Sequence, residues 1–199
     1  MTAVSTIGTA QRSRSSAYSR SRARIALAGF ATCGLAALAW ASFVHPLPRL
    51  IYNPSDSVAV GWYRVDPLHH GPGSLPPPLS VGSIVLAKLP PQAAALAAQR
   101  RYLPARVPLL KRVGATAPQH VCIFDALVWI DGVPVAAVLP ADRLGRPLPS
   151  WPHCRGLEVG ELFLLSSSNP ASFDSRYFGP VSASAVIGVA HPLWLESRP

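Results

Sequence analysis

The chain is poor in lysine, in acidic residues and in cysteine. Of its 199 residues only two are lysines, Lys88 and Lys111, nine are acidic and three are cysteines, whereas 22 are prolines. Because proline interrupts helix interiors and central strands, we expect short elements joined by long ordered loops. The length fits one domain with a hydrophobic core plus a tail, rather than two full domains.

The sequence also lacks the spacings that mark a metal site, such as C-x-x-C or H-E-x-x-H. His69 and His70 are neighbours in a segment rich in proline and glycine, which favours solvated side chains over ligands. We therefore expect no metal and no cofactor. No G-x-S-x-G motif occurs either, so a Ser-His-Asp triad built on His120, His153 or His191 has no motif to support it.

The formal charge of +9 is unevenly distributed. Five arginines, at positions 12, 14, 20, 22 and 24, lie close together near the N-terminus, and the first acidic residue is Asp56. An arginine cluster beside an apolar stretch is better explained by membrane orientation than by nucleic-acid binding, and no nucleic-acid-binding motif is present. We expect no nucleic-acid partner.

The apolar stretch is Ile25–Val44, 20 residues without a charge. That length crosses a hydrocarbon core of ~30 Å at 1.5 Å per residue. We predict a basic cytoplasmic tail over 1–24, a transmembrane anchor over 25–44 with the N-terminus inside, and an exported, periplasmic domain over 45–199. The alternative is a signal peptide cleaved near Ala39-Trp40-Ala41, although the stretch exceeds the ~7–15 residues of a signal-peptide core.

Beyond a short link at Leu47–Leu50, most of the exported part consists of short runs rich in β-branched and aromatic residues, which predict strands. These runs are Val58–Val65, Val81–Lys88, Val107–Val113, Val121–Ile130, Val133–Val138, Glu161–Ser166 and Ala185–Ala190. Asp131-Gly132 predicts a hairpin turn, and Gly61 a bend or a close backbone approach. Pro90–Arg101 predicts one short helix that starts at Pro91. Loops are expected at Asp66–Leu79 and Asp142–Gly156.

The cysteines divide between the two environments. Cys33 lies in the predicted membrane span, where it is a small apolar side chain. Cys122 and Cys154 lie in the exported part, which is an oxidising compartment if the topology is right, so we predict a disulfide between them. Two reduced thiols in the core are the alternative.

A candidate nucleophile, Ser57, lies in the segment YNPSDSVAVGWY at 52–63, two residues after Ser55. A serine hydroxyl needs a neighbouring base. Lys111, inside the apolar run VPLLKRV, is the candidate, because burial can lower a lysine pKa from ~10.4 to ~7–8. Arg112 would point to the opposite face of a strand. The structural alternative is a turn serine and a strand-end lysine.

Four segments occur in an order that resembles the signal peptidase I superfamily and, within it, the TraF-like peptidases of conjugative transfer systems. They are NPSDSVAVGWY at 53–63, LPARVPLLKRV at 103–113, GRPLPSWPHC at 145–154 and SFDSRYFGPV at 172–181. The resemblance implies a mainly β serine/lysine peptidase core of antiparallel sheets with a short inserted helix. The chain departs from classical signal peptidases at Val58 and at Ser167-Ser168-Asn169, which favours the conjugative branch, and also at Ala59 and 114–117.

The resemblance also assigns roles to residues. Ser57 matches the nucleophile and Lys111 the general base, while Ser55 matches the hydroxyl that completes an oxyanion hole with the backbone N–H of Ser57. Ser172 matches the serine that orients the lysine. The remaining pair, Asp174 and Arg176, matches a structural ion pair beneath the site.

The function implied is that of a membrane-anchored serine endopeptidase acting on exported precursors. A conjugative pilin precursor is the expected partner. Its acyl-enzyme is either hydrolysed by water or resolved by the substrate's own N-terminus, which gives a cyclic product. A general signal peptidase for secreted preproteins is the first alternative. The second is a catalytically idle assembly protein of a conjugative secretion channel.

Overall fold

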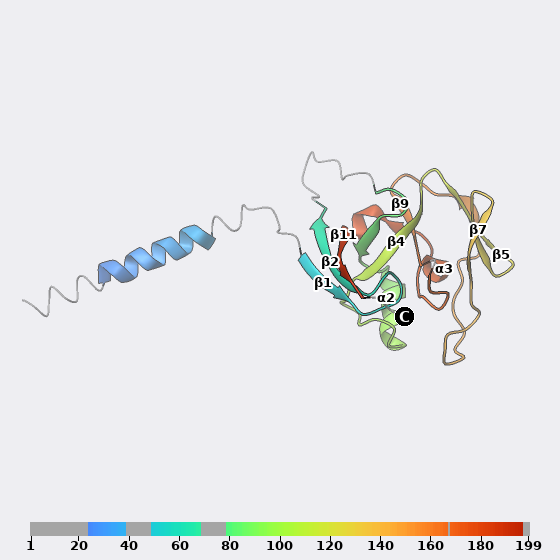
Figure 1. The fold of residues 1–199 in the computed structure, drawn as a ribbon, viewed down its shortest axis with the longest axis horizontal. Coiled ribbons are helices and arrows are strands. Elements are labelled where there is room, and N and C mark those ends of the chain that lie inside the picture. Colours follow the sequence, from blue (N-terminus) through green and yellow to red (C-terminus); the bar gives the residue numbers. More distant parts are fainter. Residues whose placement is uncertain (1–23, 39–48, 69–78, 167, 197–199) are drawn as a thin grey trace, which may run out of the picture. The chain divides into compact units, whose positions relative to one another are not determined.

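The computed structural model describes residues 24–38, 49–68, 79–166 and 168–196 (Figure 1). It divides into two compact units, Met1–Pro46 and Leu47–Pro199. In the first unit a helix runs over 24–38. The predicted tail lies outside the described residues except for Arg24, as does the end of the predicted span, 39–44. No helix among the described residues has the length and hydropathy of a membrane span, so the anchor over 25–44 stays a prediction.

The second unit is built on a seven-stranded sheet in which all neighbours are antiparallel, with the order β1-β2-β11-β3-β4-β9-β10 (Figure 1). Its strands are β1 Arg49–Asn53, β2 Gly61–Pro67, β3 Ile84–Ala87, β4 Leu109–Thr116, β9 Glu161–Leu165, β10 Val181–Ser182 and β11 Val186–Leu195. The last strand lies between β2 and β3, so the C-terminal part of the chain joins the first hairpin to the rest of the sheet.

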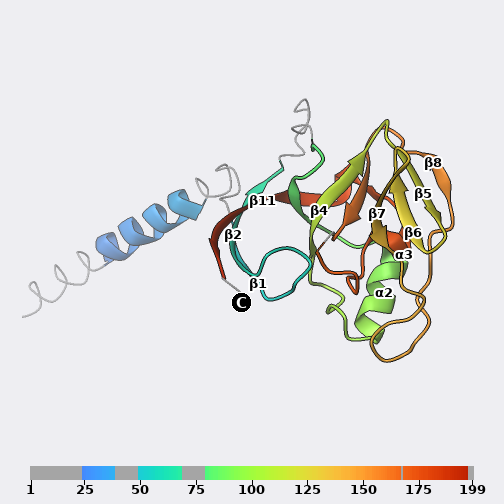
Figure 2. The same cartoon turned by 45° about the vertical axis from the view of Figure 1, so that its right-hand side comes forward.

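A smaller antiparallel sheet has the order β7-β6-β5-β8 (Figure 2). Its strands are β5 His120–Phe124, β6 Leu127–Ile130, β7 Val133–Ala137 and β8 Cys154–Gly156. The described helices of this unit are α2 Pro91–Gln99, α3 Ser175–Phe178 and a 3-10 turn at Ala183–Ala185. The mainly β prediction with few helices is confirmed.

Strand β9, between β4 and the edge strand β10, is buried on both faces, and this is why the two sheets form one core. Leu162 and Leu164 pack with residues of β3 and β4, whereas Phe163 and Leu165 pack with Val121 and other residues of the small sheet. Successive side chains of a strand point to opposite faces, so an unbroken apolar run is expected at such a position. The small sheet therefore covers one face of the large one.

Several predicted elements are confirmed. Helix α2 starts with Pro91 in its first turn and buries Ala93 and Ala97, four residues apart on one face. The turn at Asp131-Gly132 connects β6 to β7, with Ile130 paired to Val133. At Gly61 a Cβ atom would lie 2.1 Å from the carbonyl oxygen of Trp194, so the glycine permits the close approach of β11.

Three predictions were wrong in detail. Val121–Ile130 is not one strand but the β5–β6 hairpin, because Asp125 and Ala126 adopt positive φ angles of 51° and 56°. That two-residue turn has the φ signs of a type I′ turn, and alanine is not among the residues that signal it. The link at 47–50 contains the start of β1, which pairs with β2. The irregular segment Asp142–Gly156 contains β8, which pairs with β5.

Candidate active site

Ser57 lies in the loop between β1 and β2, and Asn53 fixes the shape of this loop. Asn53 is the last residue of β1 and is buried. Its Nδ2 donates hydrogen bonds to the carbonyl oxygens of Ser55 at 2.8 Å, Val58 at 3.2 Å and Ala59 at 3.1 Å. Both ends of the loop are therefore tied to one side chain. Sequence reasoning missed Asn53; the available signal was an Asn-Pro pair at the start of a turn.

Lys111 lies in β4, opposite Val85 of β3, and its side chain is almost completely buried. Burial lowers the pKa of Lys111 from 10.5 to about 8, while nearby Asp174 raises it and Arg176 lowers it. A buried ammonium loses its hydration, so the neutral amine is favoured. Arg112 is exposed and donates to the carbonyl oxygen of Gly82. The alternation predicted for these two residues is confirmed.

Ser172 lies between the two predicted catalytic groups. The Nζ of Lys111 donates a hydrogen bond to the Oγ of Ser172. The same Oγ lies 3.3 Å from the Oγ of Ser57. Ser172 is buried and Ser57 is partly exposed. The structure thus brings together three residues that are 54 or more positions apart in the sequence, and one serine hydroxyl contacts both the candidate nucleophile and the candidate base.

Asp174 and Arg176 form a fully buried ion pair, with Nε–Oδ1 and Nη2–Oδ2 distances of 2.8 and 2.7 Å. Arg176 also donates to five backbone carbonyl oxygens, those of Ala137, Ser166, Asn169, Pro170 and Ser172. Asp174 accepts the backbone N–H of Ser166 at 3.0 Å. The pair therefore satisfies its own buried charges and fixes the loop over 166–172, of which Ser172 is part.

The hydroxyl of Ser55 is hydrogen-bonded to Asn53 and does not point to the oxyanion hole that its predicted role requires. Its hydroxyl donates to Oδ1 of Asn53 at 2.8 Å, and its backbone N–H donates to the same atom at 3.2 Å. The hydroxyl proton is thus engaged within the loop. To act in an oxyanion hole beside Ser57, the hydroxyl of Ser55 has to rotate away from Asn53.

The candidate catalytic residues line a cleft of about 920 Å³. Ser55, Ser57, Lys111 and Ser172 are all part of its wall. Most of the wall is apolar, with side chains such as Leu86, Leu110 and Val107. The arrangement offers a hydroxyl, a base of lowered pKa and space for an extended chain with small or apolar side chains.

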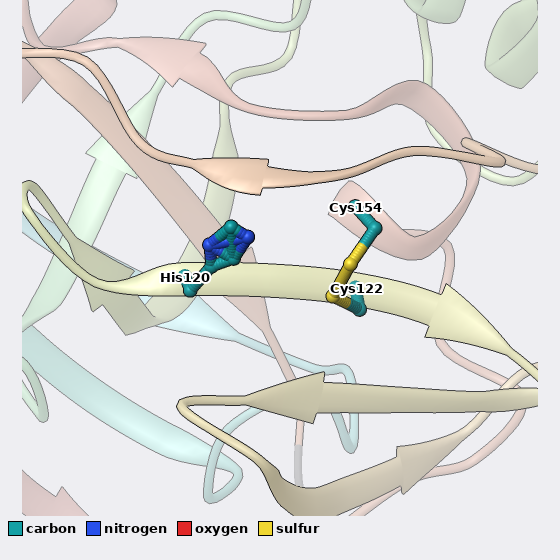
Figure 3. Close-up of side chains that lie close together, drawn as sticks. All are labelled: His120, Cys122 and Cys154. Atoms are coloured by element: carbon teal, nitrogen blue, oxygen red, sulfur yellow. A yellow bond between two sulfur atoms is a disulfide. The ribbon is translucent and has the colours of Figure 1, made fainter.

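Away from this cleft, Cys122 and Cys154 form a disulfide that joins β5 to β8 (Figure 3). His120 lies two residues before Cys122 on β5, and one of its ring nitrogens is within 4.8 Å of both sulfur atoms. Because both sulfurs are used by the disulfide, they are not thiolate ligands in this form. Cys33 is exposed on the helix over 24–38. The pair His69-His70 lies outside the described residues.

Comparison with known proteins gives one family and several relatives. The family model for "Signal peptidase, peptidase S26" matches residues 22–195. A plasmid transfer protein TraF of Escherichia coli is 32% identical over 186 residues, covering 88% of this chain and 98% of that protein. Another E. coli plasmid transfer protein TraF is 41% identical over 88 residues, 43% of this chain and 50% of that protein.

The probable conjugal transfer protein TraF of Sinorhizobium fredii is 32% identical over 179 residues, covering 86% of this chain and 90% of that protein. Among solved structures, a signal peptidase I from Enterococcus faecalis matches 58% of this chain and 98% of its own, at 23% identity and a TM-score of 0.35.

Proposed function

Because the chain belongs to the peptidase S26 family of signal peptidases, we propose that it is a serine endopeptidase with Ser57 as nucleophile and Lys111 as general base. The observation that carries this proposal is the connected set Ser57–Ser172–Lys111 in the wall of a cleft. A serine that only forms a turn and a lysine that only ends a strand do not require that contact. Burying a lysine side chain in a sheet also destabilises the fold, which favours a functional role for it.

The reaction begins with the neutral amine of Lys111. The amine accepts the proton of the Ser57 hydroxyl as the Ser57 oxygen attacks the carbonyl carbon of the scissile bond. Ser172 holds the lysine nitrogen on the side of the nucleophile. The tetrahedral intermediate then expels the leaving amine, which takes the proton from Lys111, and an acyl-enzyme remains. Lys111, which is neutral again, takes a proton from the water or second amine that attacks the acyl carbon. It passes this proton to the Ser57 oxygen as the acyl bond breaks.

The negative oxygen of the intermediate needs donors, each worth roughly 2.7–4 kcal/mol in known oxyanion holes. We assign the backbone N–H of Ser57 and the hydroxyl of Ser55 to this role. Since the Ser55 hydroxyl donates to Asn53 in the resting structure, the switch to the substrate exchanges one hydrogen bond for another. The net stabilisation from Ser55 is therefore expected to lie at the low end of that range.

The substrate we propose is an exported precursor, a conjugative pilin in particular, cleaved after a small side chain. The relatives that cover most of this chain are named plasmid transfer and conjugal transfer proteins. Attack of the substrate's own N-terminal amine on the acyl-enzyme would give a cyclic pilin, and attack of water a linear one. The uncharged stretch over 25–44, preceded by arginines, supports an anchor in the inner membrane with the domain over 45–199 in the periplasm.

The test is mass spectrometry of a pilin precursor co-expressed with the wild-type protein, Ser57→Ala or Lys111→Ala. The precursor is expected to be processed by the wild type and to stay intact with both variants. Ser80→Ala and Lys88→Ala are matched controls, because these residues are exposed and do not line the cleft. A wild-type product lighter by one further water would identify the cyclic form.

Two results would redirect the proposal. If the pilin precursor is still processed in both dyad variants, the serine peptidase proposal is refuted. The alternative is then a non-catalytic assembly protein of a secretion channel. Processing of secreted preproteins in general, with no preference for the pilin, would assign the same chemistry to a general signal peptidase.

A further inference from the structure

One part of the cleft wall, here called the cationic end, is basic, although most of the wall is apolar. Three arginines, Arg100, Arg143 and Arg146, line this end, and the acidic residue beside them is Asp142. Asp56, the other carboxylate in the wall, adjoins Ser57 in the nucleophile loop. This end thus carries three positive groups and one negative group, a formal net charge of +2.

Asp142 is fully occupied by its own neighbours. Its Oδ1 accepts the backbone N–H groups of Leu144 and Arg146, at 2.9 and 3.0 Å, and its Oδ2 accepts the hydroxyl of Tyr102 and Nε of Arg146 at 2.7 Å. Although burial opposes it, these hydrogen bonds hold the pKa of Asp142 far below its usual value. Asp142 therefore stays ionised and neutralises Arg146.

Arg100 and Arg143 have no such partner. Within the described part of the chain, neither guanidinium lies within 4 Å of a carboxylate. Arg100 makes one long contact, at 3.4 Å, to the hydroxyl of Tyr102, and Arg143 is exposed on the cleft wall. Two unmatched positive charges in a largely apolar cleft attract an anion more strongly than they would on an open surface.

The loops that carry these arginines are held to each other. The loop after β7 contacts the loop after α2 (Figure 2), because Tyr102 bonds Asp142 and Nη2 of Arg146 donates to the carbonyl oxygen of Arg100 at 3.3 Å. The guanidinium of Arg146 also lies 5.5 Å from the centre of the Tyr102 ring. Because these contacts order the two loops before a ligand binds, less backbone entropy is lost on binding.

We propose that this cationic end binds a carboxylate of the substrate, so that preferred precursors carry an acidic group near the cleaved bond. The inference rests on the proposed function in one respect, that the cleft receives a peptide. Guanidinium groups match carboxylates through paired, charge-assisted hydrogen bonds. The carboxylate can belong to an acidic side chain or to the C-terminus of the precursor, and the two sources are separable by experiment.

The experiment measures binding and cleavage separately. The full chain in detergent, as Ser57→Ala, is titrated with fluorescent peptides that carry Glu, Gln or Lys in turn at each position around a small residue. Each peptide is made with a free and with an amidated C-terminus. At one position, the Glu peptide is expected to bind about tenfold more tightly than the Gln peptide, the effect of one charge-assisted hydrogen bond. About tenfold weaker binding of all the peptides on amidation, with Glu and Gln peptides binding equally, would assign the C-terminal carboxylate instead.

The residues are tested by Arg100→Gln and Arg143→Gln, which keep most of the side-chain stem and remove the charge. The Glu/Gln affinity ratio is expected to fall toward one in the double variant, and to fall with added salt in the wild type. Arg106→Gln is the matched control, since this arginine is exposed in the same loop but does not line the cleft; it should keep the wild-type ratio.

Equal binding of Glu, Gln and Lys peptides at every position, with no loss of affinity on amidation, would overturn the inference. A carboxylate preference that is unchanged in the double variant would overturn it as well. The failure of the proposed function looks different, because the affinity ratios of Ser57→Ala do not depend on turnover. A wild type that binds Glu peptides preferentially but cleaves none would keep the carboxylate site and remove the peptidase.

Discussion

Replacing Lys111 by methionine should stabilise the fold near neutral pH while it abolishes activity. The pKa of Lys111 is lowered by burial from 10.5 to about 8. Below pH 8 both the folded and the unfolded chain hold the proton, and the folded chain carries the cost of a buried ammonium. Each pKa unit is worth 1.36 kcal/mol, so a difference of 2.5 units corresponds to roughly 3 kcal/mol.

The sign of the pH dependence follows from proton counts. Between pH 8 and pH 10.5 the unfolded chain binds more protons at this position than the folded chain, so wild-type stability rises with pH through this window. The methionine variant lacks this contribution. The stability advantage of Lys111→Met should therefore be largest at pH 6–7 and shrink by about 3 kcal/mol toward pH 10.5. The lost hydrogen bond to Ser172 subtracts about 1 kcal/mol at every pH.

The assay is urea unfolding of both proteins at pH 6, 7, 8, 9 and 10, with the difference in unfolding free energy as the readout. Titrations of other groups cancel in this difference. Lys88→Met is the matched control, because Lys88 is the second lysine of the chain and is exposed, and its effect should be the same at each pH. A Lys111→Met advantage that stays constant from pH 6 to pH 10 would refute the lowered pKa and with it the neutral base.

Three further predictions concern positioning and stability. Asn53→Ala leaves three loop carbonyl groups without their donor, so urea unfolding should show a loss of roughly 2–3 kcal/mol and peptide assays a lower kcat. Ser172→Ala should lower kcat more than KM and move the midpoint of the pH–rate profile, because Lys111 loses its partner. The double variant Cys122→Ser/Cys154→Ser opens a loop of 32 residues, and its unfolding free energy should fall by roughly 3–4 kcal/mol.

Each of these three predictions would be contradicted by a specific result. A wild-type kcat in Asn53→Ala would separate the loop from catalysis, and an unchanged pH–rate midpoint in Ser172→Ala would remove that serine from the dyad. Equal stability of the serine double variant and the wild type would show that the disulfide adds nothing to the fold.

The sequence predicted the residues whose environment is set by local pattern. Lys111 follows two leucines in an apolar run, so its burial in a strand could be inferred, and Arg112 had to point outward by alternation. The turn at Asp131-Gly132 has the residues that its φ angles require. Asp125 and Ala126 form the same kind of turn, with an alanine where glycine is usual. The sequence pattern therefore predicted a single strand where the structure has the β5–β6 hairpin.

Side-chain hydrogen bonds between distant segments were beyond such reasoning. Asn53 looked like a turn residue, yet its amide holds the nucleophile loop at both ends. Ser55 was assigned by position, but the acceptor of its hydroxyl depends on how that loop closes. The contact between Tyr102 and Asp142 joins loops 40 residues apart. No periodicity or spacing encodes these partners, because they follow from the packed fold.

The segment at 172–181 explains why the small sheet matters for a site that lies in the large one. Trp151 donates its backbone N–H to the carbonyl oxygen of Arg176 at 3.2 Å, and a Cβ atom on Gly179 would lie 2.7 Å from the Trp151 ring. Arg176 in turn donates to Ala137 at the end of β7 and to Ser172. The position of Ser172 relative to the lysine thus depends on contacts from both sheets.

A substitution that disturbs the contacts of the small sheet with α3 should therefore alter the positions of the catalytic residues without changing the cleft wall. Gly179→Ala tests this coupling, because its φ of 80° and the adjacent indole of Trp151 leave no room for a methyl group. The expected result is a lower kcat with little change in peptide affinity, since Gly179 is absent from the cleft lining. Gly132→Ala, which has the same φ of 80° but open space around it, should lose stability alone. Equal kinetic effects of the two variants would mean that backbone strain, and not contact with Trp151, controls the site.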